Sequence, residues 1–233
     1  MHSEKIPVFW KDLAQMPYGE AWDFQELHLQ KVVAQKIALR TNPDVVVPHY
    51  FFLVEHPPVF TLGKSGSESH LLAPANELEK SGIAYFKTNR GGDITFHGPG
   101  QVVGYPIFDL DQIYTDIHRY LRETEQVVID TIADFGIAGG SRKEGLTGVW
   151  VGEEKICALG VRASRWVTMH GFALNVNTDL QYFDMIVPCG IQDKGVTSMK
   201  KILGRDVDMQ EVKDVLRFHF ERIFPITFIP YEG

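Results

Sequence analysis

Two side chains in this sequence, Cys189 and Lys155, have the types and surroundings that nucleophilic catalysis needs. Pro188 and Gly190 flank Cys189 and predict that its thiol lies on a turn between apolar residues, not inside a helix or strand. Most cysteines of this kind are inert core residues. Cys189 is nevertheless a candidate nucleophile, provided that a neighbouring charge stabilises its thiolate.

Lys155 is the leading candidate for that charge, because it begins a strand-like segment whose other residues, 156–161, are apolar. Lysines in such positions usually extend to solvent. If Lys155 instead points inward beside Cys189, it lowers the pKa of the thiol, and each pKa unit corresponds to about 1.4 kcal/mol. We expect Cys157 to be a small core residue. Strand alternation predicts one face with Lys155, Cys157 and Leu159, and an opposite face with Ile156, Ala158 and Gly160.

A second candidate region runs from Arg90 to Gln101, where four glycines and a proline are interleaved with polar residues. Glycine weakens helix and strand interiors, and this density is typical of backbone that turns sharply or approaches a ligand closely. Its polar residues, among them Asp93, Thr95 and His97, can donate and accept hydrogen bonds. Composition alone leaves two interpretations open, a ligand-binding loop and a glycine-rich hairpin with solvated ends.

Spacing excludes several common sites. Residues 63–65, Gly-Lys-Ser, resemble the end of a phosphate-binding P-loop, but Pro58 occupies the position of its first glycine. Residues 98–100 begin like a dinucleotide-binding fingerprint, but the third glycine comes one place late, at Gly104. No pair of histidines or cysteines has the spacing of a zinc site, so we expect no metal.

The composition is typical of a soluble globular protein, with 44% hydrophobic and 23% charged residues among 233 and a net charge of −7. This acidic balance disfavours a general nucleic-acid binder. No segment has the pattern of a signal peptide, and no apolar run reaches the roughly 18 residues of a membrane span. Two cysteines are too few for a disulfide framework. We therefore expect a cytoplasmic protein with neither a nucleic-acid nor a membrane partner.

Hydrophobic periodicity predicts three long helices, at 19–40, 113–135 and 207–224. Strands are expected at 50–54, 59–61, 83–88, 102–110, 146–151, 155–162 and 171–176. Because no linker or repeat interrupts this order, the sequence predicts a single α+β domain over 1–233, with a mixed β-sheet flanked by helices. Residues 1–17, an N-terminal extension, match no pattern that we can assign.

Several segments together resemble the lipoyl(octanoyl) transferase family. Residues 90–105 fit its pattern of Arg-Gly-Gly, Thr-aromatic-His, Gly-Gln and Tyr. The resemblance continues through Glu-His-Pro-Pro-Val-Phe-Thr-Leu-Gly at 55–63, Lys-Ile and Ala-Leu-Gly within 155–160, His-Gly-Phe-Ala-Leu-Asn at 170–175 and Pro-Cys-Gly at 188–190. One departure is Cys157, where the family usually has another small residue.

By this resemblance, Cys189 is the acyl-thioester nucleophile and Lys155 is the general acid/base that activates it. The resemblance also implies a fold shared with biotin and lipoate protein ligases. An acyl and pantetheine channel would be lined by Arg90, Gly91, Gly92, Asp93, Ile94, Thr95, Phe96 and His97, by Ala158, Leu159 and Gly160, and by Gly171, Phe172 and Ala173.

The resemblance implies that octanoyl-acyl carrier protein is the donor and that lipoyl domains of 2-oxoacid dehydrogenases and the glycine cleavage H protein are the acceptors. The acyl group would arrive as a phosphopantetheine thioester, so no cofactor is expected. The basic residues Lys194, Lys200, Lys201 and Arg205 form either a solvated face or a docking surface for the acidic carrier protein.

Three other functions fit parts of the pattern. An ATP-dependent lipoate or biotin ligase on the same fold would not need Cys189 as a nucleophile. A thioesterase would use the same nucleophile but transfer the acyl group to water. A catalytically inactive module that binds carrier protein would need neither side chain, and the presence of both Lys155 and Cys189 disfavours it.

Overall fold

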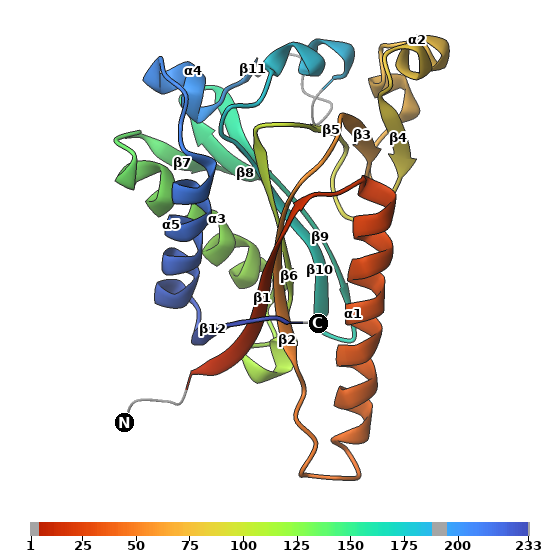
Figure 1. The fold of residues 1–233 in the computed structure, drawn as a ribbon, viewed down its shortest axis with the longest axis vertical. Helices are drawn as coiled ribbons and strands as arrows, with labels where there is room; N and C mark the ends of the chain where they lie inside the picture. The colour runs from red at the N-terminus through yellow and green to blue at the C-terminus, as the bar shows by residue number, and fades with distance from the viewer. Residues whose placement is uncertain (1–4, 188–194, 233) are drawn as a thin grey trace.

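A large mixed sheet runs through the middle of the computed structural model, which describes residues 5–187 and 195–232 (Figure 1). Its strands lie in the order β12 (Ile226–Pro230), β1 (Ile6–Gln15), β2 (His49–Glu55), β6 (Gln101–Ile107), β10 (Val167–Asn175), β9 (Glu154–Ser164), β8 (Leu146–Val151) and β7 (Gly140–Lys143), and β11 (Gly195–Val196) pairs with β9. β1 is parallel to β2 and β12, and β11 is parallel to β9. The other neighbours are antiparallel.

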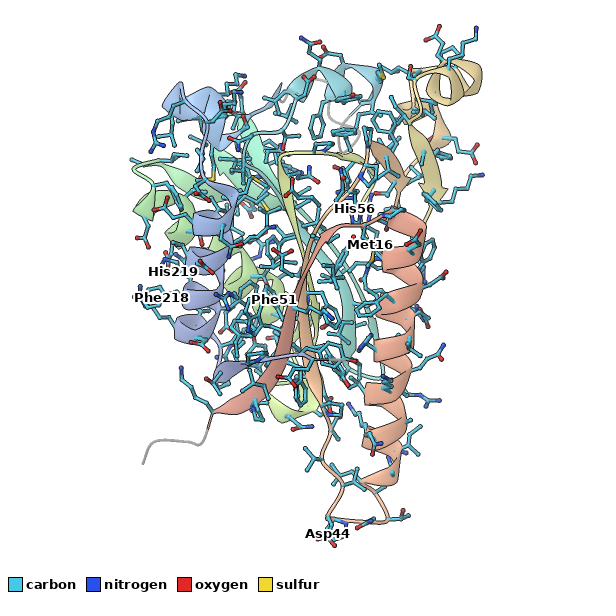
Figure 2. The ribbon with its side chains drawn as sticks, viewed as in Figure 1. Met16, Asp44, Phe51, His56, Phe218 and His219 are labelled. Carbon is cyan, nitrogen blue, oxygen red and sulfur yellow. The ribbon has the colours of Figure 1, made fainter. Side chains whose placement is uncertain are left out.

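Helices cover both faces of this sheet (Figure 1). On one face α3 (Ile117–Asp134) lies beside α5 (Met209–Ile223), and α1 (Tyr18–Ala38) packs on the other. Phe51 of β2 is fully buried on the α5 side, with its ring centroid 4.8 Å from that of Phe220 (Figure 2). Asp116 and Asp208 cap α3 and α5 by accepting hydrogen bonds from first-turn N–H groups. Within the described part of the chain, no helix has the length and apolar character that crossing a membrane requires.

A small sheet lies at the upper end of the large one in Figure 1. Its strands lie in the order β4 (Ala84–Lys87), β3 (Val59–Leu62) and β5 (Ile94–His97). Phe60 and Phe96 form a separate apolar cluster with Phe183 and Ile186. The short helices are α2 (Ala75–Lys80) and α4 (Met199–Leu203), with 3-10 segments η1 (Glu68–His70), η2 (Leu110–Gln112) and η3 (Leu180–Met185).

The predicted fold class is confirmed, and each predicted helix and strand is present, the strand at 146–151 with the predicted ends and the others with shifted ends. The second helix begins at Ile117 rather than at 113, because η2 precedes it and Asp116 caps its first turn. The sequence did not predict β5, β7, β11 or β12, nor β1 within residues 1–17. Charged residues interrupt the apolar residues of β1, so hydrophobic periodicity does not predict this strand. One of them, Asp12, pairs with Lys213 of α5 at 2.9 Å.

Candidate active site

A cavity of about 370 Å³ lies where the glycine-rich segment faces β9 and β10. The sequence-predicted residues that line it are Lys155, Arg90, Gly91, Gly92, Asp93, Ile94, Thr95, His97, Ala158, Leu159, Gly160, Gly171, Phe172 and Ala173. Phe96 does not line it, because its ring is buried in the apolar cluster of the small sheet and stacks on the ring of Tyr182, with 4.5 Å between the ring centroids. Cys189 lies outside the described residues. Tyr18, Tyr105 and His170, which the sequence analysis did not include, also line the cavity.

The glycine-rich segment lies against its neighbours because side chains are absent at the contacts. A Cβ at Gly160 would lie 2.8 Å from the carbonyl oxygen of Gly91, and a Cβ at Gly63 would lie 2.3 Å from that of Gly92. Both distances are shorter than real Cβ contacts. Of the two interpretations that composition left open, the structure therefore supports a loop built into a cavity wall, not a solvated hairpin.

Arg90 is buried and holds this loop together. Its Nη2 group donates to the carbonyl of Thr61 (2.6 Å), the hydroxyl of Thr61 (2.9 Å) and the carbonyl of Asp93 (2.8 Å). Nη1 donates to the carbonyl of Gly91 at 2.9 Å. The Asp93 carboxylate also pairs with Nδ1 of His70 at 2.6 Å. The planar guanidinium thus braces the loop through several oxygen atoms at once.

A buried chain of hydrogen bonds continues from Thr61. The Thr61 hydroxyl donates to Nε2 of His97 (3.2 Å), and His97 donates from Nδ1 to Oε1 of Gln101 (2.8 Å). Gln101 donates to Oδ1 of Asn175 (2.9 Å), and Asn175 donates to the carbonyl of Thr197 (3.0 Å). All donors and acceptors match in this one direction, which assigns the His97 tautomer. The chain connects the small sheet to β10 and to the residue after β11.

Burial keeps three histidines neutral near pH 7: His97 and His170 line the cavity, and His56 lies behind the lining residue Tyr105. Desolvation lowers the pKa of His97 well below its usual value, with smaller effects from nearby positive groups. Desolvation also lowers the pKa of His56 to about 4 and that of His170 to about 3. His56 donates from Nδ1 to the carbonyl of Met16 (2.7 Å; Figure 2) and accepts at Nε2 from the Tyr105 hydroxyl (2.6 Å). These histidines serve as neutral hydrogen-bonding groups.

His170 occupies a strained position in the cavity wall. Its φ of 57° is left-handed, which is uncommon for a residue with a side chain and frequent at functional sites. Its backbone N–H donates to Oε1 of Gln25 in α1 (2.9 Å), and its Nε2 donates to Oδ1 of Asn89 (2.7 Å). The sequence signal that could have identified it was its place directly before Gly171 in a segment already assigned to the channel.

Lys155 points into the molecule: it is 8% exposed and lines the cavity. Val149 of β8 is paired with Cys157 of β9, but Trp150 is paired with Lys155, so β9 contains one extra residue here, a β-bulge. The predicted alternation is therefore wrong at Lys155. Cys157 packs in the core beneath α3 and α5, as expected of a bystander, whereas Lys155 shares the cavity with Ala158.

The residues on either side of the Cys189 segment are held by hydrogen bonds. Before it, the N–H of Val187 donates to the carbonyl of His70 at 2.8 Å. After it, the N–H of Thr197 donates to the carbonyl of Lys155 at 3.0 Å. The Thr197 hydroxyl is buried and has no hydrogen-bond partner among residues 5–187 and 195–232.

The basic residues that follow are paired at the surface. Lys200 contacts Asp206 and Lys201 contacts Glu154, both at 2.7 Å. Both lysine side chains are half exposed, and Lys194 lies outside the described residues. In the described ranges, no group of three or more His, Cys, Asp or Glu side chains is arranged to hold a metal ion.

Comparison with known proteins shows that the sequence matches one protein family over most of its length. The sequence profile of the lipoyl protein ligase A/B catalytic domain matches residues 17–221. The chain is 52% identical over 228 residues to an octanoyltransferase of Cytophaga hutchinsonii, covering 94% of this chain and 93% of that protein. It is 53% identical over 226 residues to an octanoyltransferase of Flavobacterium psychrophilum, covering 94% and 97%.

Solved structures share the fold. A putative lipoate protein ligase from T. acidophilum with bound lipoic acid superposes with a TM-score of 0.69 at 16% identity, covering 97% of this chain and 89% of that one. A biotin protein ligase from Aquifex aeolicus in complex with biotin and ATP gives a TM-score of 0.51 at 13% identity, covering 93% and 69%. The predicted similarity to ligase catalytic domains is therefore confirmed at the level of fold.

Proposed function

Because this chain belongs to the family of the lipoyl protein ligase A/B catalytic domain, we propose that it transfers an octanoyl group from acyl carrier protein to lipoyl domains through a thioester on Cys189. Octanoyl transfer is the activity named for its relatives of about 50% identity. The acceptors are the target lysines of lipoyl domains in 2-oxoacid dehydrogenases and of the glycine cleavage H protein. The observation that carries the proposal is a buried amine, Lys155, on the wall of a cavity with room for an alkyl chain.

The cavity wall formed by β9 and β10 suits an acyl chain. Ala158 is paired with Ala173 across the two strands, and Gly160 is paired with Gly171. Four neighbouring positions that line the cavity therefore carry at most a methyl group. A strip without larger side chains leaves space along the strands, and an alkyl chain placed there is removed from water.

In the first half-reaction, the Cys189 thiolate attacks the carbonyl carbon of the octanoyl thioester. A new C–S bond forms, and the bond to the pantetheine sulfur breaks when the tetrahedral oxyanion collapses. Lys155 gives a proton to the departing thiolate and becomes a neutral amine. Backbone N–H groups near residues 158–160 or in the Cys189 turn are the candidates for stabilising the oxyanion.

In the second half-reaction, the amine of the target lysine attacks the acyl-enzyme. The amide C–N bond forms and the C–S bond to Cys189 breaks, which regenerates the thiolate. Neutral Lys155 accepts the proton that the target amine loses, so the enzyme returns to its starting state. The thioester supplies the activation, and no ATP is consumed.

Intact-mass measurement after mixing with octanoyl-acyl carrier protein tests this proposal. We expect the wild-type protein to gain one octanoyl group, located by peptide mapping on Cys189. Cys189→Ser should neither form the thioester nor octanoylate a lipoyl domain. Cys157→Ala is the matched control, because Cys157 is 1% exposed in the core, and this variant should still form the adduct.

Other outcomes would identify the alternatives. A Cys189→Ser variant that octanoylates the lipoyl domain at the wild-type rate, or only when ATP and free octanoate are supplied, would replace the proposal by a ligase. Free octanoate released at the same rate with and without a lipoyl domain would indicate a thioesterase.

A further inference from the structure

The hairpin of β8 and β9 surrounds the Lys155 side chain. Lys155 Nζ lies 4.7 Å from the ring centroid of Trp150, the residue paired with it across the two strands. Trp150 is 1% exposed and Lys155 is 8% exposed, so the contact is largely removed from water. The face of an indole ring attracts a cation, and the attraction is stronger when the pair is desolvated.

Gly148 leaves the space that the lysine stem occupies. A Cβ at this position would lie 3.2 Å from Cε and 3.4 Å from Cδ of Lys155, and 2.7 Å from the carbonyl oxygen of Cys157. Its φ of 127° is a conformation that residues with side chains rarely adopt. The alkyl chain of Lys155 therefore passes directly over a backbone position that only glycine can fill without displacing it.

Glu125 of α3 holds Gly148 in this conformation. Its Oε1 accepts a hydrogen bond of 2.8 Å from the N–H of Gly148, and the Glu125 side chain is fully buried. The other carboxylate oxygen lies 2.9 Å from Arg122 and 3.3 Å from Arg142, which balance its charge. Burying a carboxylate costs folding free energy even when two arginines pair with it. That this cost is met where the carboxylate binds the Gly148 N–H indicates that the position of Gly148 is important for the site.

We propose that Trp150, Gly148 and Glu125 are positioning residues that hold the Lys155 ammonium group in one place on the cavity wall. This inference rests on the proposed function, in which protonated Lys155 stabilises the Cys189 thiolate and protonates the departing pantetheine thiolate. The β-bulge belongs to the same device, because its extra residue sets Lys155 opposite Trp150.

Two substitutions of Trp150 test the ring contact. Phenylalanine keeps an aromatic face and leucine keeps only apolar volume. The single-turnover rate of acyl-enzyme formation should therefore fall about tenfold in Trp150→Leu and less than about threefold in Trp150→Phe. In a Cys157→Ala background, the pH midpoint of Cys189 alkylation should rise in Trp150→Leu. Equal losses of rate in the two variants, or an unmoved midpoint, would overturn the proposal.

Trp10→Leu is the matched control. Trp10 also faces a cation, the guanidinium of Arg217 at 3.6 Å, but neither residue lines the cavity. The variant loses a tryptophan and an ion contact of the same kind. Its acylation rate, corrected for the folded fraction, and its alkylation midpoint should equal those of the wild-type protein.

A second pair of variants tests the buried carboxylate. Glu125→Gln keeps an oxygen for the Gly148 N–H, whereas Glu125→Ala does not. Per folded molecule, acylation should therefore fall about tenfold further in Glu125→Ala than in Glu125→Gln. Lys155→Met separates the two proposals. If it acylates at the wild-type rate, the proposed role of Lys155 is wrong. If it is inactive while Trp150→Leu and Glu125→Ala keep the wild-type rate, only the positioning role is wrong.

Discussion

The two walls of the cavity are held by different means. The glycine-rich wall depends on the buried guanidinium of Arg90 and on a chain of neutral hydrogen bonds that continues from Thr61 as far as Thr197. The β8–β9 wall surrounds one charged side chain, Lys155, with a ring and a glycine. Removing a link from a buried chain leaves its neighbours unsatisfied, which costs stability. Substituting the residues around Lys155 mainly changes the position of its ammonium group. Substitutions in the glycine-rich wall should therefore mainly lower the stability of the protein. Substitutions in the β8–β9 wall should mainly lower the rate of acylation.

Lys155→Ala should give the largest effect and should affect rate more than stability. The variant loses the proposed proton donor and the positive charge proposed to stabilise the Cys189 thiolate, and general acid–base catalysis contributes about 10²–10⁴-fold. Single-turnover acylation should fall by about 10³-fold, with rates corrected for the folded fraction measured by circular dichroism. A loss below about tenfold would remove the proposed contrast between the walls.

Gln101→Leu should show the opposite behaviour. It removes the partners of Nδ1 of His97 and Oδ1 of Asn175, and both residues are buried. Each unsatisfied group costs about 1–3 kcal/mol, so the free energy of unfolding in urea should fall by about 3 kcal/mol. Gln30→Leu, on the exposed side of α1, is the control and should change it by less than about 0.5 kcal/mol.

Gly160→Ala tests the place where the walls touch. The added methyl would lie 2.8 Å from the carbonyl oxygen of Gly91, so the glycine-rich segment must move away from β9. We expect the KM for the octanoyl donor to rise about tenfold, measured by steady-state kinetics. Gly136→Ala, with φ of 84° and no atom within 4 Å of its Cβ, should reduce stability without changing KM. An equal rise in KM in the two variants would show that a general loss of stability, not cavity shape, is responsible.

The buried histidines in and beside the cavity make the folded protein sensitive to acid. The pKa of His56 falls from 6.5 to about 4 on folding, so between these values the unfolded chain binds a proton that the folded protein does not. Stability is therefore lost as the pH falls below 6.5, by up to about 1.4 kcal/mol per pH unit for this group. His56→Gln should give a shallower decline in urea unfolding between about pH 6.5 and 4.5, and His118→Gln, at an exposed site, should not.

The smallest effects are expected at the surface. Lys201 pairs with Glu154, but the two side chains are 51% and 41% exposed, so Lys201→Ala should change the free energy of unfolding by less than about 1 kcal/mol. Charge reversal at Lys200 and Lys201 should raise the KM for acyl carrier protein about threefold at low salt and less at high salt. An unchanged KM and salt dependence would exclude this face as the carrier-protein docking surface.

Helices and strands whose apolar faces pack against the large sheet could be predicted from the sequence, because their buried residues recur with the period of the helix or strand. The orientation of Lys155 could not, since it depends on a bulge set by the partner strand β8. Nor could the left-handed His170, whose backbone is secured by Gln25 from a distant helix. Strand β1 was not predicted because it contains charged residues such as Asp12, whose ion-pair partner Lys213 is distant in the sequence and close only in the folded structure. In each case the missing information is a contact between segments far apart in the chain.

The pairing of β1 with β12 has a consequence for biosynthesis. Ile6 is in register with Ile226, so one edge of an early strand is covered by the strand that the ribosome makes last among those described. Until β12 docks, a nascent chain presents open N–H and C=O groups along β1, and such an edge pairs readily with other polypeptides. Release of a chain that stops before β12 should therefore lead to self-association, even though every residue that lines the cavity has already been translated.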